Sequence, residues 1–478
     1  MQTSRLVKLL ICIAVFLLLW FLPASVFGID GLTVVQHRVI ALFIFGALMW
    51  ILEAIPIWTT SILIIVMMIL TVSDSMFAPL DFSDVDAEGF GKVVSHKSIM
   101  ASFADPIIML FMGGFALAIA ATKCGLDVNL ARVLLKPFGT RSEIVLLGFM
   151  IVTGIFSMFM SNTATAAMML AIVAPVLSQL PGKGKIAMAM GIPVAANVGG
   201  VGTPIGTPPN AIALGYLNSA ESGLDVTISF GQWMVAMVPF VIILLVLSWF
   251  LLIKLFPFTK KNIEFSINGS FRKDREAIIV YVTFIATVIL WVTDRYTGID
   301  SNSVAMIPLA VFAVTGIMGK EELKQINWDV LWLVAGGFAL GVGLNQSGLA
   351  KALVSSIPFD TWSPVAVIAG SGLICFTMST FMSNTASTAL LVPILAAMAS
   401  GMTEVLAPFG GATTMLLGVA VCASMAMSLP ISTPPNALAY GTGNITQGQM
   451  AKSGLIIGAV GMILGYATLF FAAKIGLF

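Results

Sequence analysis

Charged side chains are scarce in this 478-residue chain, where Asp, Glu, Lys and Arg together make up 9% of the residues. Soluble domains carry about 25%. The 23 basic and 22 acidic residues nearly cancel, and they form neither a basic tail nor a basic patch interleaved with aromatic residues. This composition excludes nucleic acid as a partner.

Histidine and cysteine are also rare, with two and four residues, respectively. Neither His37 nor His96 lies inside an apolar segment, which argues against a proton relay built on buried histidine. The cysteines lack metal-ligand spacing and are predicted to be small core residues: Cys12, Cys124, Cys375 and Cys422. The chain also has no HExxH motif and no nucleophile paired with a base. We therefore expect neither an enzyme nor an organic cofactor.

Hydrophobic residues are abundant, at 59% of the chain, and the mean hydropathy is +1.04. Apolar runs recur almost without pause, which predicts an all-α polytopic membrane protein with a single membrane domain over residues 1–478. Window hydropathy predicts about eleven transmembrane helices, near residues 6–27, 38–54, 57–73, 99–122, 187–216, 232–256, 277–294, 303–318, 328–349, 412–440 and 455–476. The first is long enough to span, which favours a membrane helix over a cleaved signal peptide.

One polar motif occurs twice inside apolar stretches, as Ser161-Asn162-Thr163 and as Ser383-Asn384-Thr385. Each copy is followed further along the chain by Thr-Pro-Pro-Asn, at residues 207–210 and 433–436. Helix-breaking prolines and small polar residues at membrane depth are tolerated only where they are buried in protein or line a cavity. Two matched breaks indicate a transporter binding site.

The Ser-Asn-Thr motifs lie in two long apolar stretches, 142–180 and 364–400. Each stretch is either two full spans or a re-entrant hairpin. Three short polar residues without flanking charge or Trp make a poor interfacial loop, so we favour re-entrant hairpins.

The two halves of the chain form a repeat. Asn162 and Asn384 are separated by 222 residues (384 − 162), and Thr207 and Thr433 by 226 (433 − 207). An odd number of spans between the two hairpins makes the repeats inverted, over residues 38–256 and 277–476, with a cytoplasmic linker at 254–276. Gly113-Gly114 and Gly336-Gly337 also match and are predicted to be close-packing sites.

The basic residues set the orientation. With a cytoplasmic N-terminus, 17 of the 23 basic residues fall on cytoplasmic loops, as the positive-inside rule requires. The C-terminus is then outside, and we expect the protein in the plasma (inner) membrane.

The motifs supply hydroxyls, amides and free carbonyls, which are ligands for a small alkali cation. Ser157 lies one helical turn before Ser161, and Ser379 stands in the same relation to Ser383. No Arg, Lys or His lies inside the motifs. An anion would be held by hydrogen bonds, by helix N-termini and by the field of bound cations.

These motifs, with Gly202 to Asn210 and Leu429 to Ala437, closely resemble the divalent anion/sodium symporter family. The resemblance covers nearly the whole chain. It implies transport of a small dianion, a C4-dicarboxylate such as succinate, malate or fumarate, together with several sodium ions. It also implies a homodimer in the lipid bilayer and an elevator-type alternating-access mechanism.

Carried onto this sequence, the resemblance implies two sodium sites and one substrate pocket. The first sodium site comprises Ser157, Ser161, Asn162 and the carbonyl of Gly206, and the second comprises Ser379, Ser383, Asn384 and the carbonyl of Ser432. Substrate carboxylates meet Asn162, Thr163, Asn384 and Thr385, with Thr207, Pro208, Thr433 and Pro434 lining the pocket.

Two alternatives share this framework, a sodium/sulfate symporter and a sodium-independent dicarboxylate or anion exchanger. The intact Ser-Asn-Thr pair favours carboxylate over sulfate, and the lack of a fixed cation beside the motifs favours sodium coupling over exchange.

Overall fold

A computed structural model describes residues 2–84, 86–219, 222, 224, 226–263, 270–356 and 362–478. Within these ranges the chain is helical and forms no β-sheet, since the β-bridges at Ser73–Val94 and Arg141–Asn262 are isolated. The prediction of an all-α membrane protein is confirmed. Residues 264–269, in the middle of the predicted linker, lie outside the described residues.

Each predicted transmembrane segment has a helical counterpart. In the described residues, ten helical stretches are long and apolar enough to cross a bilayer, or eleven with α22, which is bent by 66° from the short helices before it. The helices that match the predicted spans are α1 (Gln2–Phe21), α2 (Val34–Leu52), α3 (Ile57–Val72), α6 (Pro106–Lys123), α10 (Gly182–Gly200) with α11 (Pro208–Asn218), α12 (Phe230–Leu255), α13 (Arg275–Val292), α15 (Ser301–Val314), α17 (Trp328–Gln346), α22 (Gly411–Met425) with α23 (Pro434–Gly441), and α24 (Gln447–Lys474).

Two of these segments are broken helices. In the segment predicted at 187–216, the helix is interrupted between Gly200 and Pro208. In the segment predicted at 412–440, it is interrupted between Met425 and Pro434. In both, the second helix starts with two prolines. Proline lacks the N–H that a continuing helix needs but fits the first turn of a new one. The Thr-Pro-Pro-Asn motif therefore breaks the span and restarts it.

The Ser-Asn-Thr stretches form two helical hairpins. The first pairs α8 (Ser142–Phe159) with α9 (Asn162–Gln179), and the second pairs α19 (Pro364–Phe381) with α20 (Asn384–Gly401). Each arm has 18 residues, or about 27 Å at the helical rise. The re-entrant placement of the hairpins in the bilayer and the inverted topology of the repeats remain predictions.

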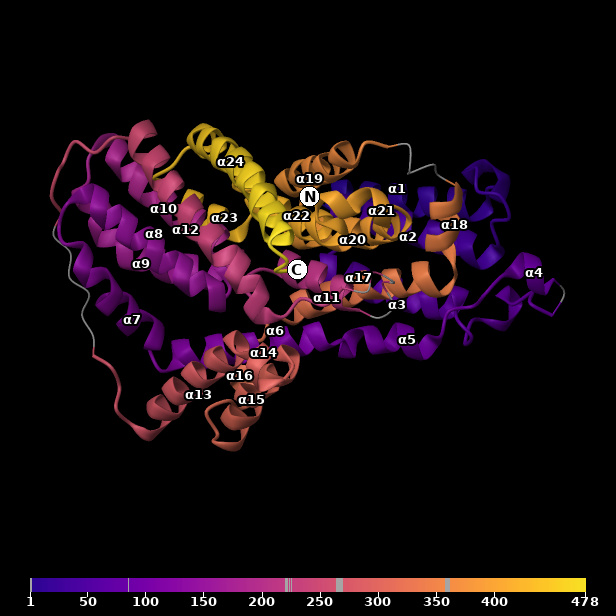
Figure 1. The fold of residues 1–478 in the computed structure, drawn as a ribbon, viewed down its shortest axis with the longest axis horizontal. Helices are drawn as coiled ribbons and strands as arrows, with labels where there is room; N and C mark the ends of the chain where they lie inside the picture. The colour runs from indigo at the N-terminus through magenta and orange to yellow at the C-terminus, as the bar shows by residue number, and fades with distance from the viewer. Residues whose placement is uncertain are drawn as a thin grey trace.

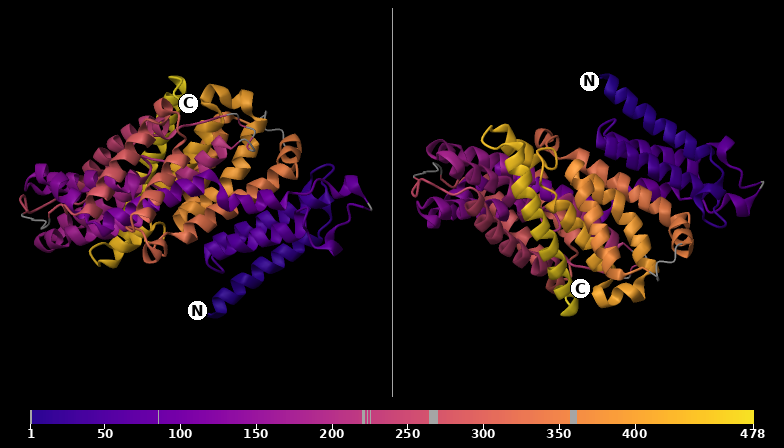
Figure 2. Two further views of the ribbon diagram at one scale, coloured as in Figure 1. Left: turned by 90° about the horizontal axis from the view of Figure 1, so that it is seen from below. Right: turned by 90° about the horizontal axis from the view of Figure 1, so that it is seen from above.

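The two halves interlock through the short helices after the breaks. α11 belongs to the first half but packs against α20 and α22 of the second, and α23 of the second half packs against α9 and α10 of the first. Helices α8, α9, α10 and α12 gather at one end of the molecule, and α2, α3 and α18 (Leu349–Ser356) lie at the other (Figure 1). Both views of Figure 2 place α1 at the edge. The two halves of the chain are therefore joined by direct helix contacts.

Glycines allow the closest helix crossings. A Cβ on Gly113 of α6 would lie 2.0 Å from the carbonyl oxygen of Ala305 in α15, and one on Gly336 of α17 would lie 2.4 Å from Cβ of Ser61 in α3. These distances support the interpretation of the two glycine pairs as packing sites.

Replacing Gly113 with Ala is predicted to lower the thermal unfolding midpoint of the purified protein, because backbone atoms of α15 must move, at a cost of about 1–3 kcal/mol. The matched control is Gly370→Ala in α19, where a Cβ meets nothing within 4 Å. There the better helix propensity of Ala should leave the midpoint equal or higher. Equal midpoints for Gly113→Ala and wild type would contradict the packing role.

Candidate functional site

All four motifs line one cavity of about 1230 Å³. Each motif also supplies the first residue of a helix: Asn162 begins α9, Asn384 begins α20, Pro208 begins α11 and Pro434 begins α23. The N-terminus of a helix carries a partial positive charge. The starts of α9 and α20 also offer unpaired N–H groups, which the prolines at the starts of α11 and α23 lack. Four positive helix ends around the motifs favour an anion there.

The asparagine of each Thr-Pro-Pro-Asn motif stabilises the break before it. Asn210 Nδ2 donates to the carbonyls of Gly200 and Thr203, at 3.0 and 2.8 Å. Asn436 Nδ2 donates to those of Met427 and Leu429, at 2.7 and 3.0 Å. These carbonyls have lost their helical partners, and lipid offers no replacement. The two breaks are thus stabilised in the same way, by an Asn amide that binds two freed carbonyls.

Oxygen atoms converge around the amide of Asn162. Ser157 Oγ lies 2.5 Å from that amide and donates to the carbonyl of Ala196 at 2.7 Å. When its nitrogen faces these oxygens, the Asn162 amide donates to Gly206 O at 3.1 Å and to Ser157 Oγ. We assign this orientation because it pairs the nitrogen with acceptors. Ser157, Ala196 and Gly206 therefore direct three oxygens at one point. Such a set of oxygen ligands suits sodium.

The second hairpin is built differently. Ser379 Oγ lies 3.9 Å from Cys375 Sγ, and Ser432 Oγ donates to the carbonyl of Thr380 at 2.8 Å. Asn384 Oδ1 is buried and has no hydrogen-bond partner among the described residues. A buried, unpaired amide oxygen is unfavourable, and it is a suitable cation ligand.

The structure brings the predicted residues together. Those that line the cavity are Ser161, Asn162, Thr163, Gly206, Thr207, Pro208, Ser383, Asn384, Thr385, Ser432, Thr433 and Pro434. Ser157 and Ser379 are fully buried and are not among the lining residues.

Sequence reasoning missed Asn197, which lies in α10 and also lines the cavity. It is 2% exposed, and its Nδ2 donates to Thr433 Oγ1 at 3.1 Å and to Asn436 Oδ1 at 3.2 Å. A buried amide in a small-residue membrane helix is itself a sign of function. The repeat comparison overlooked it because the second half has no matching asparagine.

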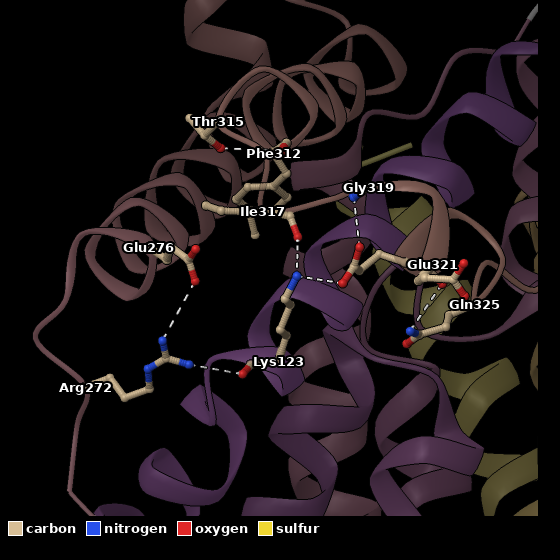
Figure 3. A network of polar contacts seen from close by, with 10 residues as sticks. Lys123, Arg272, Glu276, Phe312, Thr315, Ile317, Gly319, Glu321 and Gln325 are labelled. Carbon is tan, nitrogen blue, oxygen red and sulfur yellow. Dashed lines mark hydrogen bonds and ion pairs between the residues drawn. The ribbon is translucent and has the colours of Figure 1, made fainter.

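An ion pair lies on the rim of the cavity. Lys123 Nζ, at the end of α6, contacts Glu322 Oε1 at 2.6 Å and the carbonyl of Ile317 at 2.8 Å. Arg272 donates to the carbonyl of Lys123 at 3.4 Å and lies 3.8 Å from Glu276 (Figure 3). These contacts join α6, the start of α13 and α16 (Lys320–Leu323).

The rim carboxylate is held ionised. The hydrogen bond from Lys123, followed by that from the N–H of Gly319, lowers the pKa of Glu322 to about 2. Because the pKa is lowered in the folded protein, this pair stabilises the fold at any pH above the ordinary pKa of a glutamate. That stabilisation is lost as the pH falls through about 2. The pair therefore persists at any physiological pH.

A second, smaller cavity of about 320 Å³ lies beside Tyr216 and Phe338. Tyr216 Oη, from α11, donates to the carbonyl of Gly337 in α17 at 3.0 Å, and its ring lies 5.5 Å from that of Phe338. Neither residue lines the large cavity. The tyrosine forms a contact between α11 and α17 at the end of the site remote from Lys123.

The chain matches the family model of the sodium:sulfate symporter transmembrane region over residues 3–472. It belongs to this family. As a family member with ten candidate spans, the protein is an integral multi-pass membrane protein.

Characterised relatives are transporters. The chain is 30% identical to the sodium-dependent dicarboxylate transporter SdcS of Staphylococcus saprophyticus, with 95% of this chain and 89% of that protein covered. It is 29% identical to SdcS of Staphylococcus aureus strain USA300, with 89% and 84% covered. This family member is thus a transporter and not an enzyme.

Two solved structures share the fold. The YdaH transporter of Alcanivorax borkumensis has a TM-score of 0.54 at 15% identity, covering 79% of this chain and 88% of that chain. MtrF of Neisseria gonorrhoeae has a TM-score of 0.52 at 14% identity, covering 78% and 83%. At these identities the likeness concerns the fold alone.

Proposed function

We propose that the protein is a secondary active transporter that couples the import of C4-dicarboxylates such as succinate, malate or fumarate to sodium. The observation that carries this proposal is the convergence of four helix N-termini and two oxygen-rich hairpin tips on one cavity. The first feature suits a dianion and the second suits sodium.

The anion is held without a salt bridge to the motifs. Lys123 is the one basic residue among the described side chains that line the cavity, and Glu322 neutralises it at the rim. The carboxylates instead accept from the first N–H groups of α9 and α20 and from Thr hydroxyls. The prolines that open α11 and α23 remove N–H donors there, so these two helices contribute mainly their dipoles.

Sodium binding prepares the anion site through the Asn162 amide. With the nitrogen inward, the amide bonds to Gly206 O and Ser157 Oγ. A sodium ion that takes these oxygens repels the nitrogen and attracts Oδ1, so the amide turns and directs its N–H groups into the cavity. The cation thereby supplies charge and frees a donor for the dianion, which gives coupled rather than independent binding.

The names of the staphylococcal relatives support sodium and dicarboxylate as the transported species. The family description itself names sulfate, which keeps a sodium/sulfate symporter as the alternative. The cavity of about 1230 Å³ has room for either anion. The preference for a dicarboxylate therefore rests on the names of these relatives and on the intact Ser-Asn-Thr pair.

An elevator-type motion fits the packing. The hairpins, the broken helices, α12 and α24 pack on one another and form what we term the carrier bundle. This bundle meets the remaining helices along α17, whose Gly337 and Gly341 lie against Ala389 and Tyr216. Small residues give a smooth surface for sliding. We assign the remaining helices to a scaffold that forms a homodimer.

The rim of the cavity carries Lys123, in the set of basic residues that the positive-inside rule places in the cytoplasm. We therefore assign this structure to the inward-open state, with Tyr216 and Gly337 closing the outer side.

Uptake of labelled succinate into proteoliposomes is predicted to need an inward sodium gradient, with sulfate competing poorly. Asn162→Ala and Asn384→Ala should each reduce uptake at least tenfold, because a hydrogen bond to a charged group is worth about 1.5–3 kcal/mol. Asn444→Ala, at a half-buried loop position that does not line the cavity, is the control and should transport normally. Sodium-independent exchange, or sulfate uptake in preference to succinate, would refute the proposal.

Cysteine labelling tests the direction of opening. The four native cysteines are buried, so their background is low. In Ala164→Cys, at an exposed cavity position, a membrane-impermeant thiol reagent should react faster from the cytoplasmic side than from outside. Ala166→Cys is the control, since Ala166 is 0% exposed, and should react slowly from both sides. Faster labelling of Ala164→Cys from outside would reverse the assignment.

A further inference from the structure

Asn197 connects the two repeats at the centre of the cavity. It lies in α10 of the first half, and both of its hydrogen-bond acceptors, Thr433 Oγ1 and Asn436 Oδ1, belong to the second half. The direction of these bonds is fixed. Asn436 must use its nitrogen for the carbonyls of Met427 and Leu429, so its oxygen faces Asn197, and Asn197 must present its nitrogen.

These bonds determine what the Thr433 hydroxyl can do. Its oxygen accepts from Asn197 Nδ2 at 3.1 Å and from the backbone N–H of Asn436 at 3.3 Å. A threonine hydroxyl has two acceptor positions and a single proton to donate. Because both acceptor positions are engaged, the group left for a ligand is the O–H. Thr433 lines the cavity and is therefore held as a donor.

The first half lacks this arrangement. Asn197 lies three residues before Gly200, whose carbonyl Asn210 binds, and Ser424 lies three residues before Met427, whose carbonyl Asn436 binds. At the offset of 226 that relates the two Thr-Pro-Pro-Asn motifs, Asn197 matches Ala423, which has no hydrogen-bonding side chain. The neighbouring Ser424 donates within its own helix, to Ala420 O at 3.1 Å. Asn210 Oδ1 has no partner among the described residues, and Thr207 makes no side-chain capping bond.

We propose that Asn197 is a positioning residue that fixes the Thr433 hydroxyl as a hydrogen-bond donor to one carboxylate of the carried dianion. The two ends of the pocket are consequently unequal. The Thr433 end accepts only a hydrogen-bond acceptor such as a carboxylate oxygen. The Thr207 hydroxyl is free of this constraint and can donate or accept. This inference rests on the proposed function, because it specifies how that anion site binds its substrate.

The test is a double-mutant cycle of succinate affinity, measured on purified protein at saturating sodium. Thr433→Val removes the hydroxyl and keeps the side-chain shape, and we expect it to weaken binding about tenfold to a hundredfold. Asn197→Ala should weaken binding by a similar factor. Since Asn197 acts through Thr433, the double variant should bind no more weakly than Thr433→Val alone.

Two controls separate positioning from a general structural effect. Ser424→Ala, at the polar residue next to the matched position in the other half, should leave the affinity unchanged. Stabilisation of Asn197→Ala by sodium alone should equal that of wild type. If Asn197→Ala does not fold, the cycle is run with Asn197→Ser, which keeps a small polar side chain and should show the same non-additivity.

Independent, multiplying losses from the two substitutions would overturn the proposal, as would wild-type succinate affinity in Asn197→Ala or in Asn197→Ser. Failure of the wild-type protein to bind succinate in sodium would instead count against the proposed function. The two failures are therefore distinguishable.

Discussion

Backbone groups within a bilayer must find their hydrogen-bond partners inside the protein, because lipid supplies none. This constraint governs the site. Each Thr-Pro-Pro-Asn break exposes carbonyls, which Asn210 and Asn436 satisfy in the same way in the two halves. In the first break, Trp233 adds a third hydrogen bond, from its indole N–H to the carbonyl of Val201 at 2.9 Å. Once the breaks are stable, the new helix starts direct their positive ends at the cavity, together with those of the hairpins.

The interlocking of the repeats turns two half-sites into one pocket. α11 packs on the second hairpin and α23 on the first, so each hairpin contacts a short helix from the opposite half. In the proposed mechanism, a cation and an anion bind side by side in one electrostatic environment. Coupling then needs no long-range relay, because the ligands stabilise each other directly and through the Asn162 amide.

The sequence predicted the parts of the site that occur twice or carry proline. Duplicated Ser-Asn-Thr and Thr-Pro-Pro-Asn motifs located both hairpins and both breaks, since such residues are costly at membrane depth. Sequence comparison missed Asn197 because the second half has Ala423 at the matched position. The Ala196 carbonyl escaped because any residue supplies a carbonyl. The contact of Lys123 with Glu322 depends on how distant loops meet, which local periodicity does not encode.

The central claim is that helix N-termini and bound sodium, and no fixed basic side chain, hold the dianion. Calorimetric titration of the purified protein tests it most directly, with succinate titrated in sodium and in choline, and sodium titrated with and without succinate. We predict that sodium raises succinate affinity at least tenfold and that succinate raises sodium affinity by the same factor, as thermodynamic linkage requires. Equal succinate affinity in sodium and in choline would contradict the account.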